Sequence, residues 1–175
     1  MHAQAKAEIK DKGFLVSSVL GSQNLLIETD TFTGIILLEQ ENASEGSTVY
    51  LPSVKEVLLA EEILLSCFEK DTVDFSHDSM FISKRRIYPL SRYKRQYTGS
   101  YDKNGDKMIR VSFSLGRKNE PWQHDSWLRR QQIVRDGGNS YWSISINLKT
   151  KRCGYFMVNG LALDKPALPF FALNI

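Results

Sequence analysis

The chain has 175 residues, a formal net charge of +3, 42% hydrophobic residues and 25% charged residues. These values predict one globular domain with its own apolar core, and they argue against a disordered chain or a strongly basic nucleic-acid-binding chain. Every apolar stretch is shorter than the roughly 18 residues that a membrane helix needs, so no transmembrane segment is expected.

The first 51 residues predict short N-terminal β segments. Apolar or β-branched runs alternate here with polar and glycine-containing turns. The runs are Phe14–Leu20, Asn24–Glu28, Ile35–Glu39 and Thr48–Leu51. Residues 52–160 then predict a helix and a meander of strands, and residues 161–175 predict an irregular tail of the same single domain.

One amphipathic helix is predicted from Ser53 to about Lys70. Ser53 and Glu56 have the spacing of a capping box, in which each residue satisfies a backbone N–H of the other. Apolar residues then recur at helical spacing. They are Val54, Val57, Leu58, Leu64, Leu65 and Phe68.

Downstream, the period changes from that of a helix to that of a strand. Residues 92–101 and 107–115 alternate, and a turn that contains Gly105 separates them. A three-residue loop with Gly105 in the left-handed conformation would place Tyr97 opposite Val111 and Tyr93 opposite Leu115. This register keeps apolar side chains together, so we predict it over a two-residue Asn-Gly loop.

Two further hairpins are predicted. Gln131–Arg135 and Ser140–Leu148 flank the turn signal at residues 136–139, and a tight turn at residues 149–150 leads into Arg152–Asn159. The predicted fold is therefore α+β, with one helix packed on a curved antiparallel sheet and additional short N-terminal strands. This order of elements is that of the cystatin-like and nuclear-transport-factor-2-like (NTF2-like) folds.

Glu61 is the most informative position in the helix. Its angular position places it beside the apolar stripe, and a buried carboxylate needs a partner. We predict that Glu61 meets Arg95, which lies between Tyr93 and Tyr97 in the inward-facing row, or else a tyrosine hydroxyl. The pair would be either a polar tie between helix and sheet or the lining of a ligand pocket.

The loop at residues 116–126 is the best candidate for a binding site. It holds Trp122, His124 and Asp125, and Trp127 follows directly. Tryptophan in a polar loop suits stacking against a sugar or a peptide. The alternative is that both indoles fold back to close the core.

Other groups of polar residues give weaker evidence for a functional site. None of the three histidines stands in a nucleophile or Cys/His signature, so no catalytic residue is assigned. Asp71, Asp74, His77 and Asp78 match no known cation-binding loop, and no metal or other cofactor is expected. The basic residues from Lys84 to Arg95 interleave with tyrosines that alternate as a core-facing row. The basic residues are therefore interpreted as a solvated face, which disfavours nucleic acid as a partner.

The two cysteines, Cys67 and Cys153, have no zinc-binding spacing. We expect two buried thiols, with a single disulfide in an exported protein as the alternative. Ala3-Gln4-Ala5, followed by a charged segment, resembles the end of a cleaved signal peptide. Export to the periplasm or cell surface is therefore an expectation.

A family resemblance points the same way. Its motifs are Arg95–Tyr101, Lys103-Asn104-Gly105, Asp136-Gly137-Gly138 with Tyr141, Ile146–Thr150 and Val158-Asn159-Gly160. Together they resemble a family of uncharacterised small envelope proteins from Gram-negative gut anaerobes, over roughly residues 52–162. The resemblance implies an exported protein and carries over no catalytic residue. The function expected is a non-enzymatic binding or scaffolding module with a glycan or protein partner, and the alternative is a small-molecule or enzymatic pocket between helix and sheet.

Overall fold

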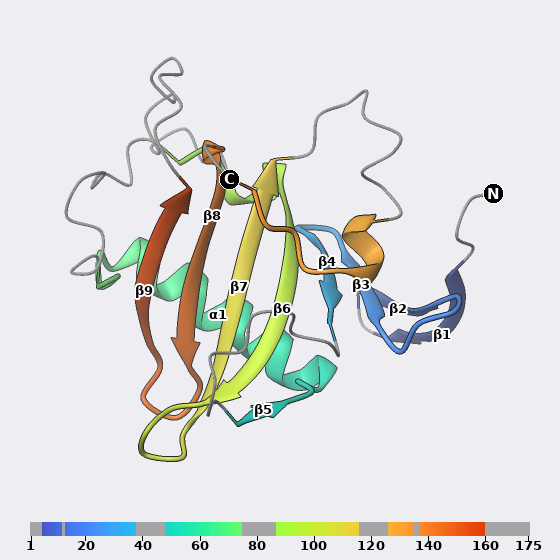
Figure 1. Cartoon of the computed structure of the whole chain (residues 1–175), viewed down its shortest axis with the longest axis horizontal. Coiled ribbons are helices and arrows are strands. Elements are labelled where there is room, and N and C mark those ends of the chain that lie inside the picture. The colour runs from blue at the N-terminus through green and yellow to red at the C-terminus, as the bar shows by residue number, and fades with distance from the viewer. Residues whose placement is uncertain are drawn as a thin grey trace.

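A computed structural model describes residues 5–11, 13–37, 48–74, 87–115, 126–134 and 137–159 of the chain. Within these residues one helix packs on a nine-stranded, mostly antiparallel sheet, so the α+β class is confirmed (Figure 1). The strands are β1 (Ala5–Asp11), β2 (Phe14–Val19), β3 (Leu25–Thr29), β4 (Thr33–Ile36), β5 (Val49–Tyr50), β6 (Tyr93–Tyr101), β7 (Lys107–Leu115), β8 (Gly138–Asn147) and β9 (Arg152–Asn159).

The N-terminal strands continue the same sheet. Its strand order is β1-β2-β3-β4-β6-β7-β8-β9, and β5 pairs with β6 off this path. β4 runs parallel to β6, in register from Thr33 opposite Lys94 to Ile36 opposite Tyr97. A parallel pair needs a crossover, and the helix between the two strands in the sequence supplies it. The prediction of an antiparallel sheet is therefore wrong for this one pair, and β1 was not predicted.

The helix α1 spans Val54–Glu69, and its predicted start and end are confirmed. Ser53 Oγ accepts a hydrogen bond from the Glu56 backbone N at 3.3 Å. The Glu56 carboxylate accepts one from the Ser53 backbone N at 2.8 Å, which completes the capping box. Lys70 is the C-cap residue. No helix among the described residues is long and apolar enough to cross a membrane.

The hairpin of β6 and β7 has the predicted register. Tyr97 lies opposite Val111, and Tyr93 lies opposite Leu115. The Asp102 backbone N donates to the Asp106 carbonyl at 2.9 Å, and Gly105 has a φ of 79°. A three-residue loop with glycine in the left-handed region therefore sets the register, and it places the alternate tyrosines on the face toward the helix.

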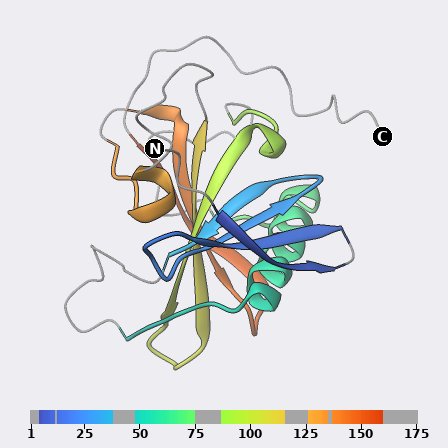
Figure 2. The same cartoon turned by 90° about the vertical axis from the view of Figure 1, so that its right-hand side faces the viewer.

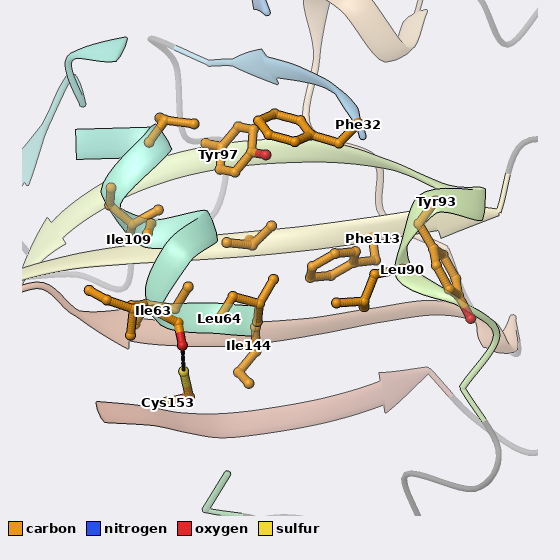
Figure 3. Close-up of a cluster of buried hydrophobic side chains, with 14 of the residues drawn as sticks. Phe32, Ile63, Leu64, Leu90, Tyr93, Tyr97, Ile109, Phe113, Ile144 and Cys153 are labelled. Carbon is orange, nitrogen blue, oxygen red and sulfur yellow. Dashed lines mark hydrogen bonds between the residues drawn. The ribbon is translucent and has the colours of Figure 1, made fainter. Parts of the chain in front are cut away.

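The main core lies between α1 and the sheet. Figure 2 shows the helix on one side of the strands, and Figure 3 shows Ile63 and Leu64 of the helix among Ile109 and Ile144 of the strands. The predicted inward rows are confirmed, because their residues share one buried cluster with the helix. From the sheet it includes Tyr93, Tyr97, Val111, Phe113, Trp142, Ile144 and Ile146; from the helix it includes Val57, Leu64 and Phe68, with the partly buried Leu58 packed against it.

The predicted strand at 131–135 is wrong in its described part. Residues 126–129 form a helical turn, residues 131–134 are irregular, and the neighbours of β8 are β7 and β9. A side chain holds this segment instead of a strand partner. The Gln96 amide nitrogen donates to the carbonyls of Trp127 at 2.8 Å and Arg130 at 2.7 Å, and its oxygen accepts from the Gln132 backbone N at 2.8 Å. The segment therefore crosses β6 on the side away from the helix (Figures 1 and 2).

Cys67 near the end of α1 and Cys153 at the start of β9 form a disulfide across 86 residues of chain. The expectation of two buried thiols is therefore wrong, and the cysteines form the single disulfide that was the alternative. Both residues are buried in the main core. The disulfide therefore fastens the helix to β9, the strand at one edge of the sheet. The Asp74 backbone N, just beyond the helix, also donates to the Cys153 carbonyl at 2.9 Å.

Candidate functional site: two faces of the sheet

Strands β6–β9 have two faces of opposite character. We call the face that packs on α1 the inner face, and the opposite face, which carries Lys94, Thr98, Arg110, Ser143 and Met157, the outer face. Because side chains alternate along a strand, each of these strands contributes to both faces. The inner face holds Arg95 on β6 and the outer face holds Arg110 on β7, and these two arginines differ in their partners.

On the inner face, Glu61 lies beside Arg95, as the sequence predicted. The Nε of Arg95 is 3.1 Å from Glu61 Oε1, and the Tyr97 hydroxyl donates to the same oxygen at 2.8 Å. Glu61 is only 5% exposed and Arg95 only 2%. The Arg95 Nε makes no aligned hydrogen bond within the described residues, so the contact is an ion pair rather than a hydrogen bond.

The surroundings of this pair are packed with aromatic rings. The Arg95 guanidinium carbon lies 4.8 Å from the centre of the Phe32 ring and 5.5 Å from that of Phe113. Figure 3 shows the rings of Phe32 and Tyr97 next to each other. Burial raises the pKa of Glu61, and the opposing effects of Arg95 and the Tyr97 hydroxyl do not cancel it. This packing favours a polar tie that orients helix on sheet over a ligand pocket.

Gly34 of β4 makes room for the Tyr97 ring. It pairs with Arg95 in the parallel ladder, and a Cβ atom there would lie 3.1 Å from the Tyr97 Cζ and closer still to a second ring carbon. A glycine is therefore required for the ring to lie against β4 with its hydroxyl on Glu61. Burial raises the pKa of Tyr97 well above its usual value, so the hydroxyl keeps its proton and donates it to Glu61.

Tyr93, the remaining member of the predicted group, is engaged elsewhere. Its hydroxyl donates to the Asn139 carbonyl at 2.6 Å and accepts from the Tyr88 backbone N at 3.1 Å. Burial raises its pKa to about 12. Tyr93 thus ties the start of β8 to the segment before β6, and the structure brings Glu61, Arg95 and Tyr97 together without it.

Of the predicted stacking site, the structure describes only Trp127. This residue is 4% exposed and packs in a second small core with Val19, Ile35 and Leu37. Trp127 is therefore not an open stacking platform. Its indole folds back into a core, which was the alternative for this residue. Trp122, His124 and Asp125 lie outside the described residues, as do His77, Asp78 and the tail at 161–175.

The basic and aromatic residues around β6 do not form one surface. Arg95 is buried on the inner face, whereas the Lys94 ammonium lies on the outer face, 5.1 Å from the centre of the Trp127 ring. Arg92 lies over the Tyr88 ring. Lys84, Arg85 and Arg86 are outside the described residues. The expectation of a single solvated face is wrong for Arg95, which is an inner-face residue.

The outer face is rich in hydroxyl groups and poor in acids. Strands β6, β7, β8 and β9 contain no aspartate or glutamate, although they contain five lysines and arginines. Adjacent outer-face positions pair across the strands as Gln96 with Ser112, Ser112 with Ser143, Thr98 with Arg110, and Arg110 with Ser145. The residues directly opposite Arg110 on the neighbouring strands therefore carry neutral hydroxyl groups.

Arg110 is partly buried, and no carboxylate contacts it among the described residues. Its Nη2 donates to Ser143 Oγ at 2.9 Å and lies 3.8 Å from the Met157 sulfur, while its buried Nε has no hydrogen-bond partner in the same part of the chain. Burial lowers its pKa. By contrast, Lys107 pairs with Glu56 at 2.6 Å and Lys149 with Asp106 at 2.7 Å. Arg110 is thus a desolvated cation, and the residues that the structure describes do not use all of its donors.

Strand β9, at the edge of the sheet, carries two exposed side chains, and one of them, Met157, lies beside Arg110. Met157 is 47% exposed and Tyr155 is 56% exposed. Register shifts between Ser143 and Ser145 where β9 pairs with β8, and Tyr155 in this bulge has a φ of 50°, which is uncommon for a residue other than glycine. Bulges of this kind redirect side chains, and strained residues cluster at functional sites. The outer face therefore combines a partly buried cation, hydroxyl groups and the exposed Met157, and the edge strand beside it contains the bulge at Tyr155.

The outer face was not predicted as a site, although the sequence carries a signal for it. The alternation that predicts Val111 and Phe113 as inward-facing also places Arg110, Ser112 and Ser114 on the opposite face. Four consecutive strands without an acidic residue would have marked this face. Compared with known proteins, the chain matches no family model, no curated protein sequence and no solved structure.

Proposed function

We propose that this chain is an exported, non-enzymatic binding module, and that the outer face of β6–β9 holds its partner, a glycan. The observation that carries the proposal is Arg110, a partly buried cation without a carboxylate partner among the described residues, on a face otherwise lined by hydroxyl groups. Hydroxyl and guanidinium groups are among the groups that bind sugars.

The composition of this face supports binding over catalysis. Nucleophilic catalysis needs a base beside the nucleophile, whereas the serine hydroxyl that contacts Arg110 receives a hydrogen bond from a cation. A protein partner is the weaker alternative, because the centre of a protein interface is usually apolar and this face carries hydroxyl groups. In such an interface, the exposed Met157 would supply an apolar contact at the rim.

Export is supported by the disulfide. Disulfides persist in oxidising compartments and are rare in the reducing cytosol. Cys67 and Cys153 are joined in the core, and the resemblance to envelope proteins of gut anaerobes agrees with this. We infer that the protein reaches the periplasm or the cell surface, and fractionation of the producing cells with an antibody to the chain would test this.

For the fold, we infer that α1 with β6–β9 is a cystatin-like or NTF2-like unit. The support is the order of the elements, one helix followed by a meander of long antiparallel strands against which it packs. The parallel strand β4 and the N-terminal meander β1–β3 are additions to that unit.

A steric block tests the proposed binding surface. Ser145 lies opposite Arg110 in the sheet, so Ser145→Trp would fill the centre of the outer face. The matched control, Glu62→Trp, adds the same ring at an exposed position of the helix on the other side of the sheet. On an array of neutral and acidic glycans, we expect the wild type and the control to bind and the blocked variant to lose binding. Absence of glycan binding by the wild type, or equal binding by all three proteins, would refute the proposal.

A further inference from the structure

We propose that Arg110 is an anion anchor, and that the glycan bound on the outer face carries an acidic group, a carboxylate or a sulfate ester, which pairs with its guanidinium. This inference rests on the proposed function and adds the chemical class of the ligand. Its basis is the contrast between Arg110 and the other described cations of the sheet.

The other cations of β6–β9 each have a partner or lie in water. Arg95 pairs with Glu61, Lys107 pairs with Glu56, and the Lys94 ammonium lies against the Trp127 ring. Arg152, at the first position of β9, is exposed to water. Arg110 alone among these five is both partly buried and without an anionic or aromatic partner among the described residues.

Taking a guanidinium out of water is costly unless its donors find acceptors. The Nη2 of Arg110 donates to Ser143 Oγ at 2.9 Å and lies near the Met157 sulfur, which is a weak acceptor. Its Nε has no acceptor in the described part of the chain. Because the Nε has no exposed surface, a ligand can approach only the terminal nitrogens of the guanidinium, and paired hydrogen bonds to the two oxygen atoms of a carboxylate or a sulfate are a geometry that arginine favours.

The surroundings of Arg110 favour an acidic sugar over a nucleic acid as its ligand. Strands β6–β9 contribute no carboxylate that would repel an anion or compete for the guanidinium. Of the two residues that lie opposite Arg110 in register, Thr98 is buried, whereas Ser145 is half-buried and can offer its hydroxyl group to a sugar. Met157, which is exposed and lies beside Arg110, offers an apolar contact to a sugar ring. With Lys94 held against the Trp127 ring, Arg110 is an isolated cation among hydroxyl groups, which fits an acidic sugar better than the many evenly spaced phosphates of a nucleic acid, because those need a row of cations.

The test uses polygalacturonate as the carboxylate ligand, carboxyl-reduced polygalacturonate as its neutral counterpart, and dextran sulfate with dextran as the sulfated pair. Binding of the full chain to each is measured by calorimetry. We expect the wild type to bind at least one acidic polymer more tightly than its neutral counterpart. Whichever acidic polymer binds identifies the carboxylate or the sulfate as the group recognised.

Arg110→Gln should weaken that binding by about ten- to a hundredfold, because a charge-assisted pair is lost. Arg110→Lys keeps the charge without the planar fork and should recover only part of the affinity. Lys55→Gln, which removes a charge from an exposed position of the helix, should leave the affinity unchanged within about twofold.

Unchanged acidic-glycan binding in Arg110→Gln, or an equal loss in Lys55→Gln, would overturn the assignment of Arg110. Equal binding of acidic and neutral polymers would overturn the acidic class while leaving the proposed glycan-binding function intact. A wild-type chain that binds none of the four polymers but binds neutral glycans on the array would likewise overturn the acidic class alone. A chain that binds no glycan at all refutes the proposed function itself.

Discussion

Arg95 and Arg110 stand on neighbouring strands, one on each face of the same sheet, and differ in what surrounds them. Arg95 on the inner face has an acid within 3.1 Å and aromatic rings on either side. Arg110 on the outer face has hydroxyl groups and a thioether, and no described acid. The inner arginine is a component of the core, whereas the outer arginine is a cation that the described part of the chain leaves unneutralised. A buried charge that the fold itself satisfies indicates structure, and a partly buried charge that it does not satisfy indicates a ligand.

The largest expected effect comes from breaking the inner pair. Arg95→Met leaves the Glu61 carboxylate buried without its cation, which should cost about 3–5 kcal/mol of unfolding free energy. The double variant Glu61→Leu with Arg95→Met removes both charges, so it should recover most of that loss. Urea unfolding of the two single variants and the double variant measures this coupling. A double variant as unstable as Arg95→Met would show that the pair is not the reason for the loss.

A smaller loss is expected from the disulfide that fastens the helix to the inner face. Replacing both Cys67 and Cys153 by serine should lower the free energy of unfolding by about 2–5 kcal/mol, since the unfolded chain is no longer constrained over a long loop. Thermal unfolding of the wild type with and without a reductant should reproduce the difference. The double-serine variant is the control, because its unfolding should not respond to the reductant.

The pH dependence of stability sharpens the comparison at Glu61. Burial raises the pKa of Glu61 in the native state, so the native state binds this proton more tightly than the unfolded state, where the pKa is about 4.5. Its contribution to stability is therefore fully present below about pH 4.5 and is lost as the pH rises through the raised native pKa. The slope cannot exceed about 1.4 kcal/mol per pH unit for one proton.

Glu61→Gln removes this titration, so the variant provides the baseline. The difference in unfolding free energy between the wild type and Glu61→Gln, measured from about pH 4 to about pH 7, should become less favourable to the wild type as the pH rises. A difference that instead grows with pH would mean that Arg95 and Tyr97 outweigh burial. In that case the native pKa of Glu61 would be lowered.

What the sequence predicted well follows from short-range rules. The capping box at Ser53 and Glu56, the register set by Gly105 and the contact of Glu61 with Arg95 each depend on local spacing or on strict alternation. The segment at 131–134 failed because its partner is the side chain of Gln96, which no periodicity encodes. The parallel pairing of β4 with β6 failed for a related reason, since it joins strands that are far apart in the sequence. The absence of acidic residues from β6–β9 is visible in the sequence, but the lack of a charge partner for Arg110 shows only after the sheet is assembled, so the outer face was not predicted.

The smallest expected effect on stability is at Arg110, where the effect on binding should be the greatest. Arg110→Gln gives up one hydrogen bond to Ser143 and also removes a buried Nε that has no partner among the described residues. These two contributions oppose each other, so the free energy of unfolding should change by no more than about 0.5 kcal/mol, as for an ordinary surface substitution. Urea unfolding of this variant beside Arg95→Met tests the contrast between the two faces directly. A loss of several kcal/mol at Arg110 would mean that the chain itself depends on this cation, and that the guanidinium is a structural group like Arg95 rather than one held for a ligand.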